Sequence, residues 1–302
     1  MTDELPDFRR MPVPEALAWL AEHGEPADPR PDIDTDSLVR RFPHLAAVTT
    51  VDDVLAGTGG HIPVRAYHDP TAAPSGRALV WVHGGAFIGG HLDMPESNWV
   101  ALELASRGIP VLAVDYTKCL AGIHYPVPAD DVLTAWRYAL ETAPHLLGVP
   151  AHALALGGAS AGSTLAAGVV VELVATGEPV PSGLVLVYPV VHPNGPAAST
   201  VLDPGSPHAQ LTLNYAGSEE VLGDPRAFAG VGDGDGFPPT LVVVCENDAL
   251  RPSGEAFVRT LERAGVPVDL HLEPGAEHGH INDPGRSDAR NTLDAIIAWL
   301  AE

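Results

Sequence analysis

A pentapeptide of the form Gly-x-Ser-x-Gly, at residues 158–162, is the first candidate for chemistry in this chain. A short apolar run, 153–156, precedes it, and an alanine-rich run of helix length, 163–175, follows it. A serine at such a strand-to-helix turn has an exposed hydroxyl, and the first amides of the helix can stabilise a negative charge. The spacing therefore predicts that Ser160 is a nucleophile, with an ordinary tight turn as the alternative.

A serine is a good nucleophile only when a base accepts its proton and a third group orients that base. Asp248 follows the apolar run 240–245 by three residues, and His278 lies just beyond the run 268–272. The carboxyl ends of parallel strands meet at one edge of a sheet, so both side chains are expected to lie near Ser160.

A His-Gly-Gly-Ala-Phe run begins at His83, directly after the apolar run 78–82. Successive glycines leave backbone amides uncovered, so the N–H groups of Gly84 and Gly85 can converge with that of Ala161 on a developing oxyanion. We predict that these three amides form an oxyanion hole and that His83 holds the glycine loop in place.

The elements that must position these residues alternate in type from residue 78 onward. Alternating apolar runs and helix-length segments predict βαβ units and a mainly parallel sheet with helices on both faces. Before them, strands at 48–55 and 62–67 flank a glycine-rich turn and are predicted to form an antiparallel hairpin at a sheet edge. The remaining strands are expected at 78–82, 111–114, 153–156, 184–188, 240–245 and 268–272, and helices at 14–23, 96–106, 129–141, 163–175, 211–222, 254–264 and 286–300.

Two segments interrupt this alternation. Residues 1–45 are rich in proline and charge, and the interval at about 190–238 contains several prolines and glycines with one modest helix candidate. Long connections in a compact domain are usually functional, so we expect lids or binding insertions. Within the second segment, Asp233 and Asp235 alternate with glycine as in a calcium loop, but the closing glutamate is missing, and we interpret the stretch as a turn.

Composition limits the possible partners and compartment. The formal charge of −23 would repel phosphate, so nucleic acid is not an expected partner. Without an apolar leader or an apolar run of membrane-spanning length, the sequence favours a cytoplasmic protein with no membrane association. Cys119 and Cys245 lack C-x-x-C spacing and are predicted to be packing residues. No metal-ligand spacing is found, and four histidines are expected at the surface or in loops: His91, His124, His192 and His208.

From about residue 79 to the C-terminus, the chain resembles bacterial members of the hormone-sensitive-lipase-like family of α/β-hydrolase carboxylesterases. The matching segments are His83-Gly-Gly-Ala-Phe, Gly158-Ala-Ser-Ala-Gly, Leu186-Val-Tyr-Pro-Val, Asp248-Ala-Leu-Arg and Gly275-Ala-Glu-His-Gly.

The resemblance implies a role for each predicted site residue. Ser160 would be the nucleophile, His278 the general base and Asp248 its orienting carboxylate; the oxyanion donors would be Gly84, Gly85 and Ala161. It also implies a catalytic domain of residues 46–302 beneath a cap, which is built from residues 1–45 and the insertion at about 190–238.

Several positions depart from the family pattern or leave alternatives open. Asp115-Tyr116 is followed by Thr117-Lys-Cys-Leu-Ala-Gly-Ile, where the family usually has Asp-Tyr-Arg-Leu-Ala-Pro-Glu. Ala159 and Ser163 replace residues that are common beside the nucleophile. His280 offers a second imidazole near His278, and Asp248 could instead cap the following helix, with Glu246 as the acid.

These observations predict a serine carboxylester hydrolase that works through an acyl-enzyme and needs no metal or organic cofactor. The family resemblance implies that its substrates are short- to medium-chain esters. The alternatives are an amidase, lactonase or acyltransferase acting on a specialised metabolite, or a non-catalytic ligand-binding relative. The sequence leaves the oligomeric state open, with a homodimer as one possibility. Candidates for the substrate pocket, which core packing explains equally well, are Phe87, Ile88, Trp99, Leu211, Leu213 and Tyr215.

Overall fold

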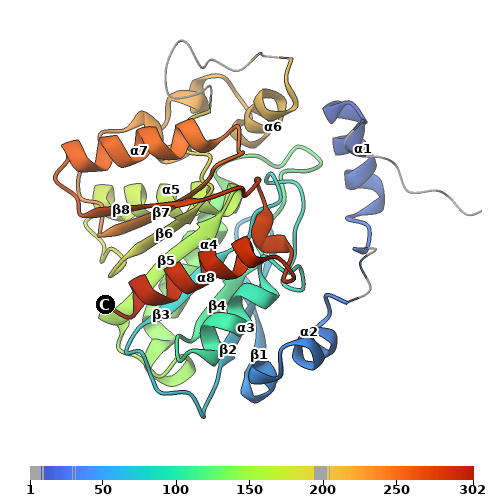
Figure 1. Ribbon diagram of the computed structural model, residues 1–302. Coiled ribbons are helices and arrows are strands. Elements are labelled where there is room, and N and C mark those ends of the chain that lie inside the picture. Colours follow the sequence, from blue (N-terminus) through green and yellow to red (C-terminus); the bar gives the residue numbers. More distant parts are fainter. Residues whose placement is uncertain (1–7, 9, 29, 31, 194–202, 204) are drawn as a thin grey trace, which may run out of the picture.

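An eight-stranded sheet in the order β1-β2-β4-β3-β5-β6-β7-β8 forms the centre of the protein (Figure 1). The computed structural model describes residues 8, 10–28, 30, 32–193, 203 and 205–302. Every strand pair from β4 across to β8 is parallel, whereas β2 is antiparallel to both β1 and β4. The strands are β1 Thr49–Ala56, β2 His61–His68, β3 Ala78–Val82, β4 Val111–Val114, β5 Leu154–Ala159, β6 Leu184–Val187, β7 Thr240–Cys245 and β8 Val268–Glu273.

Helices cover both faces of the sheet and bury a hydrophobic core on each (Figure 1). Side chains of β3 alternate between the two cores: Val80 and Val82 pack under α4 and α5, whereas Trp81 packs under α3 and α8. The predicted α/β architecture and edge hairpin are therefore confirmed. The described helices are α1 Val13–His23, α2 Thr35–Arg41, α3 Asn98–Ser106, α4 Val127–Leu146, α5 Ala161–Thr176, α6 Pro207–Ala216, α7 Arg251–Arg263 and α8 Ser287–Leu300.

Helices α6 and α2 depart from the predicted arrangement for local reasons. Helix α6 begins at Pro207, earlier than expected, because Ser206 caps its N-terminus by accepting a hydrogen bond from the Ala209 amide, and it ends where Gly217 adopts a left-handed conformation. Helix α2 was not predicted; it has only seven residues, and Asp34, the residue before it, caps its N-terminus by accepting a hydrogen bond from the Ser37 amide.

The two interrupting segments contribute α1 and α6, which lie beyond the end of the sheet where the catalytic candidates are found (Figure 1). In the second segment, the amide of Asp235 donates to the Asp233 carboxylate at 3.1 Å, which is the bond of an Asx turn. Within the described residues, no helix is both long and apolar enough to cross a membrane.

The turn between β5 and α5 depends on close packing of backbone against backbone. Ser160 has φ 52° and ψ −119°, an unusual conformation for a non-glycine residue. A side chain at Gly162 would place its Cβ 2.1 Å from the carbonyl oxygen of Val82, and one at Gly158 would lie 2.7 Å from the same oxygen. The two glycines therefore let α5 begin directly against the end of β3.

Replacement of Gly162 by alanine tests this packing. Alanine favours a helix by about 1 kcal/mol relative to glycine, but the contact with Val82 requires backbone movement. We expect Gly162→Ala to lower the free energy of unfolding by about 1–3 kcal/mol, measured by urea denaturation. Gly223→Ala is the control, because a Cβ there meets nothing within 4 Å. Equal stability of the two variants would contradict the proposed packing constraint.

Candidate active site

Ser160, His278 and Asp248 form one hydrogen-bonded chain. The Ser160 hydroxyl lies 2.8 Å from Nε2 of His278, and Nδ1 of His278 lies 2.8 Å from Oδ2 of Asp248. The Asp248 carboxylate can only accept, so its bond assigns the Nδ1 proton of His278 and leaves Nε2 to accept from the serine. The arrangement is that of a nucleophile, a base and an orienting acid.

The hydrogen bonds around Asp248 and His278 distinguish them from the alternative acid, Glu246, and the alternative base, His280. The other oxygen of Asp248 accepts from the Leu250 amide at 2.8 Å, so the carboxylate caps the following turn and orients His278 at once. Glu246 accepts instead from the Gly275 amide. His280 is buried, with Nδ1 3.3 Å from Sγ of Cys245 and Nε2 2.7 Å from the hydroxyl of Thr292. Neither alternative residue is bonded to Ser160 or His278.

The loop after β3, residues 83–90, lies against the serine turn. A Cβ at Gly84 would be 3.0 Å from Cβ of Ser160, which shows how closely the two segments approach. The Gly84 amide, predicted to be free for an oxyanion, instead donates to Oε2 of Glu96 at 2.5 Å. This corrects the predicted donor set, since Gly84 has its acceptor inside the protein. Within the described residues, the amides of Gly85, Ala86 and Ala161 have no acceptor.

Unusual backbone conformations gather around this site. Within the described part of the chain, five non-glycine residues have positive φ, and four of them belong to the serine turn, the loop after β3 or the end of β6. Such conformations each cost on the order of 1–3 kcal/mol and persist only where surrounding structure enforces them. The four residues are Ala86, Phe87, Ser160 and Tyr188.

Glu96 is the buried carboxyl that connects these strained segments. Besides the Gly84 amide, it accepts hydrogen bonds from the hydroxyl of Tyr188 and from the side-chain amide of Asn282. The Tyr188 ring in turn packs against the imidazole of His278, with ring centres 4.7 Å apart. Burial raises the pKa of Glu96, and the hydrogen bonds oppose that change. One side chain thus joins the loop after β3 to the support of the histidine.

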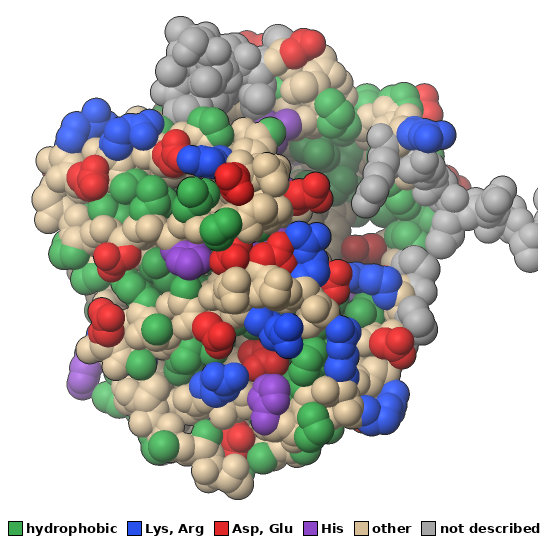
Figure 2. Space-filling model, viewed as in Figure 1, with side chains coloured by type: hydrophobic (Ala, Val, Ile, Leu, Met, Phe, Trp, Pro, Cys, Tyr) green, Lys and Arg blue, Asp and Glu red, His purple; other side chains and the backbone are tan. Residues whose placement is uncertain are grey.

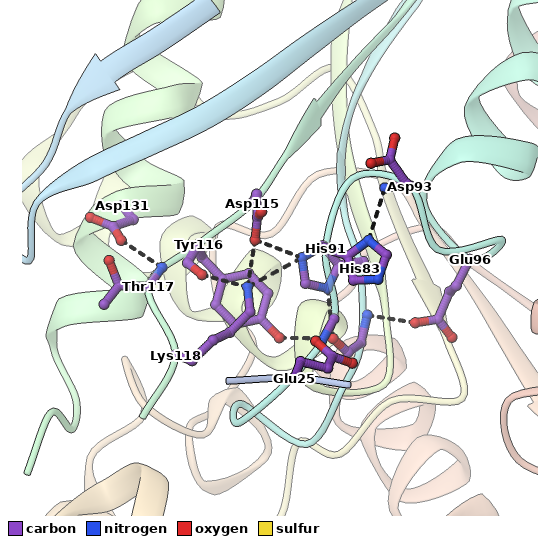
Figure 3. A network of polar contacts seen from close by, with 12 residues as sticks. Glu25, His83, His91, Asp93, Glu96, Asp115, Tyr116, Thr117, Lys118 and Asp131 are labelled. Atoms are coloured by element: carbon purple, nitrogen blue, oxygen red, sulfur yellow. Dashed lines mark hydrogen bonds and ion pairs between the residues drawn. The ribbon is translucent and has the colours of Figure 1, made fainter. Parts of the chain in front are cut away.

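A second polar cluster lies on the other side of the same loop (Figure 3). The ammonium of Lys118 donates to Asp115 and to the carbonyl of Tyr116, each at 2.6 Å. Nδ1 of His83 and the hydroxyl of Tyr116 both donate to the carbonyl of Gly84, at 2.7 and 2.9 Å. His83 therefore holds the glycine loop, as expected from the sequence.

Burial and charge oppose each other at Asp115. Burial alone would raise the pKa of this carboxyl, but its contacts with His83 and Lys118 outweigh burial and lower the pKa to about 2. Burial lowers the pKa of Lys118, and Asp115 opposes that shift. The sequence indicated the unusual loop that carries Lys118 but gave no sign of these contacts.

An apolar cavity of about 850 Å³ opens beside the loop after β3. Its walls come from α1, from the loop itself and from α6, and they include Ala16, Leu20, Ala86, Ile88 and Leu211. In Figure 2 the surface is hollowed between α1 and the rest of the protein, and hydrophobic side chains lie inside the hollow. The cavity thus places both irregular segments beside Gly85 and Ala86 of the loop after β3.

Of the six residues predicted to line the substrate pocket, Ile88 and Leu211 line this cavity. Phe87 and Tyr215 stack on each other with ring centres 4.0 Å apart inside the hydrophobic core, and Trp99 is buried in the core on the opposite face of the sheet. Leu213 is 41% exposed. Core packing, the alternative reading from sequence, therefore accounts for Phe87, Trp99 and Tyr215.

The described residues contain no group of three or more His, Cys, Asp or Glu side chains arranged to hold a metal ion. Cys119 and Cys245 are buried and unpaired.

Comparison with known proteins agrees with this geometry. A family model described as the alpha/beta hydrolase fold matches residues 79–282, from β3 to just beyond the histidine loop. The chain belongs to the α/β-hydrolase family. The matched region contains Ser160, Asp248, His278 and the whole loop after β3.

Several of the proteins that resemble this chain are esterases. The chain is 33% identical over 288 residues to an ethyl acetate hydrolase of Pseudomonas putida, covering 87% of this chain and 89% of that protein. It is 31% identical over 254 residues to carboxylesterase NlhH of Mycobacterium tuberculosis, with 80% and 78% covered. A hyperthermophilic esterase from the archaeon Pyrobaculum calidifontis has a similar structure, with a TM-score of 0.75 at 26% identity over 95% of this chain and 96% of that one. These matches confirm the resemblance to hormone-sensitive-lipase-like carboxylesterases.

Stability should depend on pH through Asp115. A carboxyl whose pKa is lowered in the folded state stabilises the protein above its unfolded-state pKa, and this contribution is lost as pH falls toward the folded-state value. We expect Asp115→Asn to reduce the free energy of unfolding by about 2 kcal/mol at neutral pH. The difference from wild type should shrink between about pH 4 and pH 2.

Urea titrations at neutral pH and at about pH 3 measure this difference directly. An Asp36→Asn variant, changed at an exposed position of α2, is the control. A stability difference that stays the same at both pH values would contradict the role given to the Asp115 carboxylate.

Proposed function

We propose that the protein is a serine carboxylester hydrolase that works through an acyl-enzyme, with Ser160 as nucleophile, His278 as general base and Asp248 as the orienting acid. The observation that supports this most directly is the continuous hydrogen-bonded chain from the serine hydroxyl through His278 to Asp248, with 2.8 Å at each step.

In the proposed reaction, Ser160 attacks the ester carbonyl as His278 takes its proton at Nε2. The resulting imidazolium is stabilised by Asp248, whose side chain is only 3% exposed. His278 then gives the proton to the departing alcohol, and an acyl group remains on Ser160. Water attacks this acyl-enzyme by the same sequence of proton transfers and releases the acid.

The developing oxyanion needs donors that are free of internal acceptors. We propose the amides of Gly85 and Ala161, two of the three donors expected from the sequence, and add Ala86 in place of Gly84. We choose these three amides because none of them has a hydrogen-bond acceptor in the described part of the chain. Each such donor contributes on the order of 3–4 kcal/mol to transition-state stabilisation in enzymes where it has been removed.

We propose that the cavity beside these donors binds an acyl group of short to medium length. Its volume of about 850 Å³ is within the usual range for small-molecule sites, and its lining is mostly apolar. We propose that residues 1–45 and about 190–238 form a cap over a catalytic domain of residues 46–302, because α1 and α6 supply walls of this cavity. A fatty acyl chain would lie between them.

Replacement of Ser160 by alanine tests the central proposal. We expect Ser160→Ala to reduce kcat for p-nitrophenyl acetate by about 10⁴-fold or more, because the variant lacks the hydroxyl on which the proposed acyl-enzyme forms. A fluorophosphonate probe should label wild type and not the variant. Ser218→Ala, at an exposed serine, should keep both activity and labelling. Hydrolysis that survives in Ser160→Ala would remove this serine from the mechanism.

Substitution of Leu211 tests the acyl pocket. Leu211→Trp should fill part of the cavity and lower kcat/KM for p-nitrophenyl octanoate about tenfold, with the acetate ester within about twofold of wild type. Leu213→Trp is a matched control on the same helix, since that side chain is 41% exposed. If Leu211→Trp lowered kcat/KM equally for the octanoate and the acetate ester, the acyl group would lie outside this cavity.

A further inference from the structure

The peptide group that joins Gly84 to Gly85 is held by two donors (Figure 3). Its carbonyl oxygen accepts from Nδ1 of His83 at 2.7 Å and from the hydroxyl of Tyr116 at 2.9 Å. The peptide is planar, so the same two bonds fix the direction of the Gly85 N–H at its other end. On the preceding peptide, the Gly84 N–H is fixed by Glu96.

Lys118 contacts both of these donors. Its ammonium lies 4.1 Å from the centre of the Tyr116 ring and 3.5 Å from Nε2 of His83. It is held there by Asp115 and by the carbonyl of Tyr116. Lys118 is also the only lysine in the 302-residue sequence. The family's usual run carries an arginine one position earlier, so this contact comes from the unusual loop of this chain.

The positions of the protons follow from these contacts. A carbonyl oxygen can only accept, so His83 carries a proton on Nδ1 and presents Nε2 toward the ammonium. Burial lowers the pKa of His83 and the charge of Lys118 lowers it further, whereas Asp115, whose Oδ1 lies 3.4 Å from the same Nε2, opposes both effects. Over the phenol ring of Tyr116, the ammonium draws electron density away from the O–H that faces Gly84. At Nε2 of His83 it offsets the Asp115 carboxylate, which on its own would weaken the N–H that faces Gly84. Both groups then become stronger donors.

We propose that Lys118 is a positioning residue for the oxyanion hole, fixing and polarising the Gly84–Gly85 peptide through His83 and Tyr116. This inference rests on the proposed function, in which the Gly85 amide stabilises the oxyanion. Two donors on the carbonyl make the N–H of the same peptide a stronger donor. Lys118 thus acts on the transition state without touching the substrate.

Removal of the charge should lower kcat and leave KM nearly unchanged. Loss of a whole oxyanion donor lowers kcat by about 10²–10³-fold, so weakening of one donor should cost about tenfold in Lys118→Met. KM for p-nitrophenyl acetate should stay within about twofold. The inhibition constant of butylboronic acid, which forms a tetrahedral anion on the serine, should rise by the same factor as kcat falls.

The matched control is Arg65→Met. Arg65 is 17% exposed, against 18% for Lys118, and it also pairs with carboxylates, namely Asp52 and Asp93. It makes no contact with Gly84, His83 or Tyr116 among the described residues. We expect this variant to keep the kcat and boronate affinity of wild type.

Tyr116→Phe provides a second route if Lys118→Met does not fold. It removes only the hydroxyl and keeps the ring beneath the ammonium, so kcat should fall about threefold. In the double variant, the loss should be smaller than the product of the single losses, because both side chains act on one carbonyl.

Because the sequence has a single lysine, NMR can observe the Lys118 side chain directly. Protein grown with lysine labelled at Cε with carbon-13 has one such side-chain resonance, and butylboronic acid should shift it in wild type but not in Ser160→Ala. The inference would be overturned if Lys118→Met had the same kcat as Arg65→Met. It would also be overturned if kcat of Lys118→Met fell while its affinity for butylboronic acid stayed that of wild type. A Ser160→Ala variant that still hydrolyses esters would instead refute the proposed function itself.

Discussion

The site depends on the close contact between the first turn of α5 and the end of β3. Gly158 and Gly162 let the backbone of the serine turn pack against the carbonyl of Val82, and the loop that follows β3 is thereby brought against Ser160. Ser160 and the loop after β3 follow neighbouring parallel strands, so the distance between them is fixed by the spacing of the sheet and by the absence of side chains at the two glycines.

The strained backbone at this contact is maintained by buried polar groups rather than by packing alone. Glu96 holds the loop after β3 on one side, and Tyr116 with His83 holds it on the other. A buried carboxyl is costly unless it is fully hydrogen-bonded, and each of the two Glu96 oxygens has a partner. The hydrogen bonds of Glu96, Tyr116 and His83 thus offset the stability lost to the positive φ angles. The same hydrogen bonds hold the loop in the geometry that the proposed reaction requires.

The sequence was sufficient to predict the fold and the three residues of the proposed triad, because strand periodicity, glycine spacing and chain order are local patterns. It was insufficient for Gly84, whose amide is bonded to a glutamate twelve residues away in the turn before α3. It left open whether Trp99 lines the pocket or packs in the core, since a single apolar residue gives no sign of which face of the sheet it covers. The polar supports Glu96, Tyr188 and Asn282 come from three distant segments, so no spacing could indicate them.

The N-terminal segment is also joined to this loop by one hydrogen bond. After α1, the carboxylate of Glu25 accepts from the amide of Gly90 at 2.6 Å, and Glu25 itself borders the apolar cavity. Docking of the segment and the geometry of the loop are therefore thermodynamically linked. Linkage is reciprocal, so an acyl group that favours the ordered loop must tighten the hold on the N-terminal segment by the same free energy. If the proposed function holds, occupancy of the cavity and docking of the N-terminal segment are therefore two measures of one equilibrium.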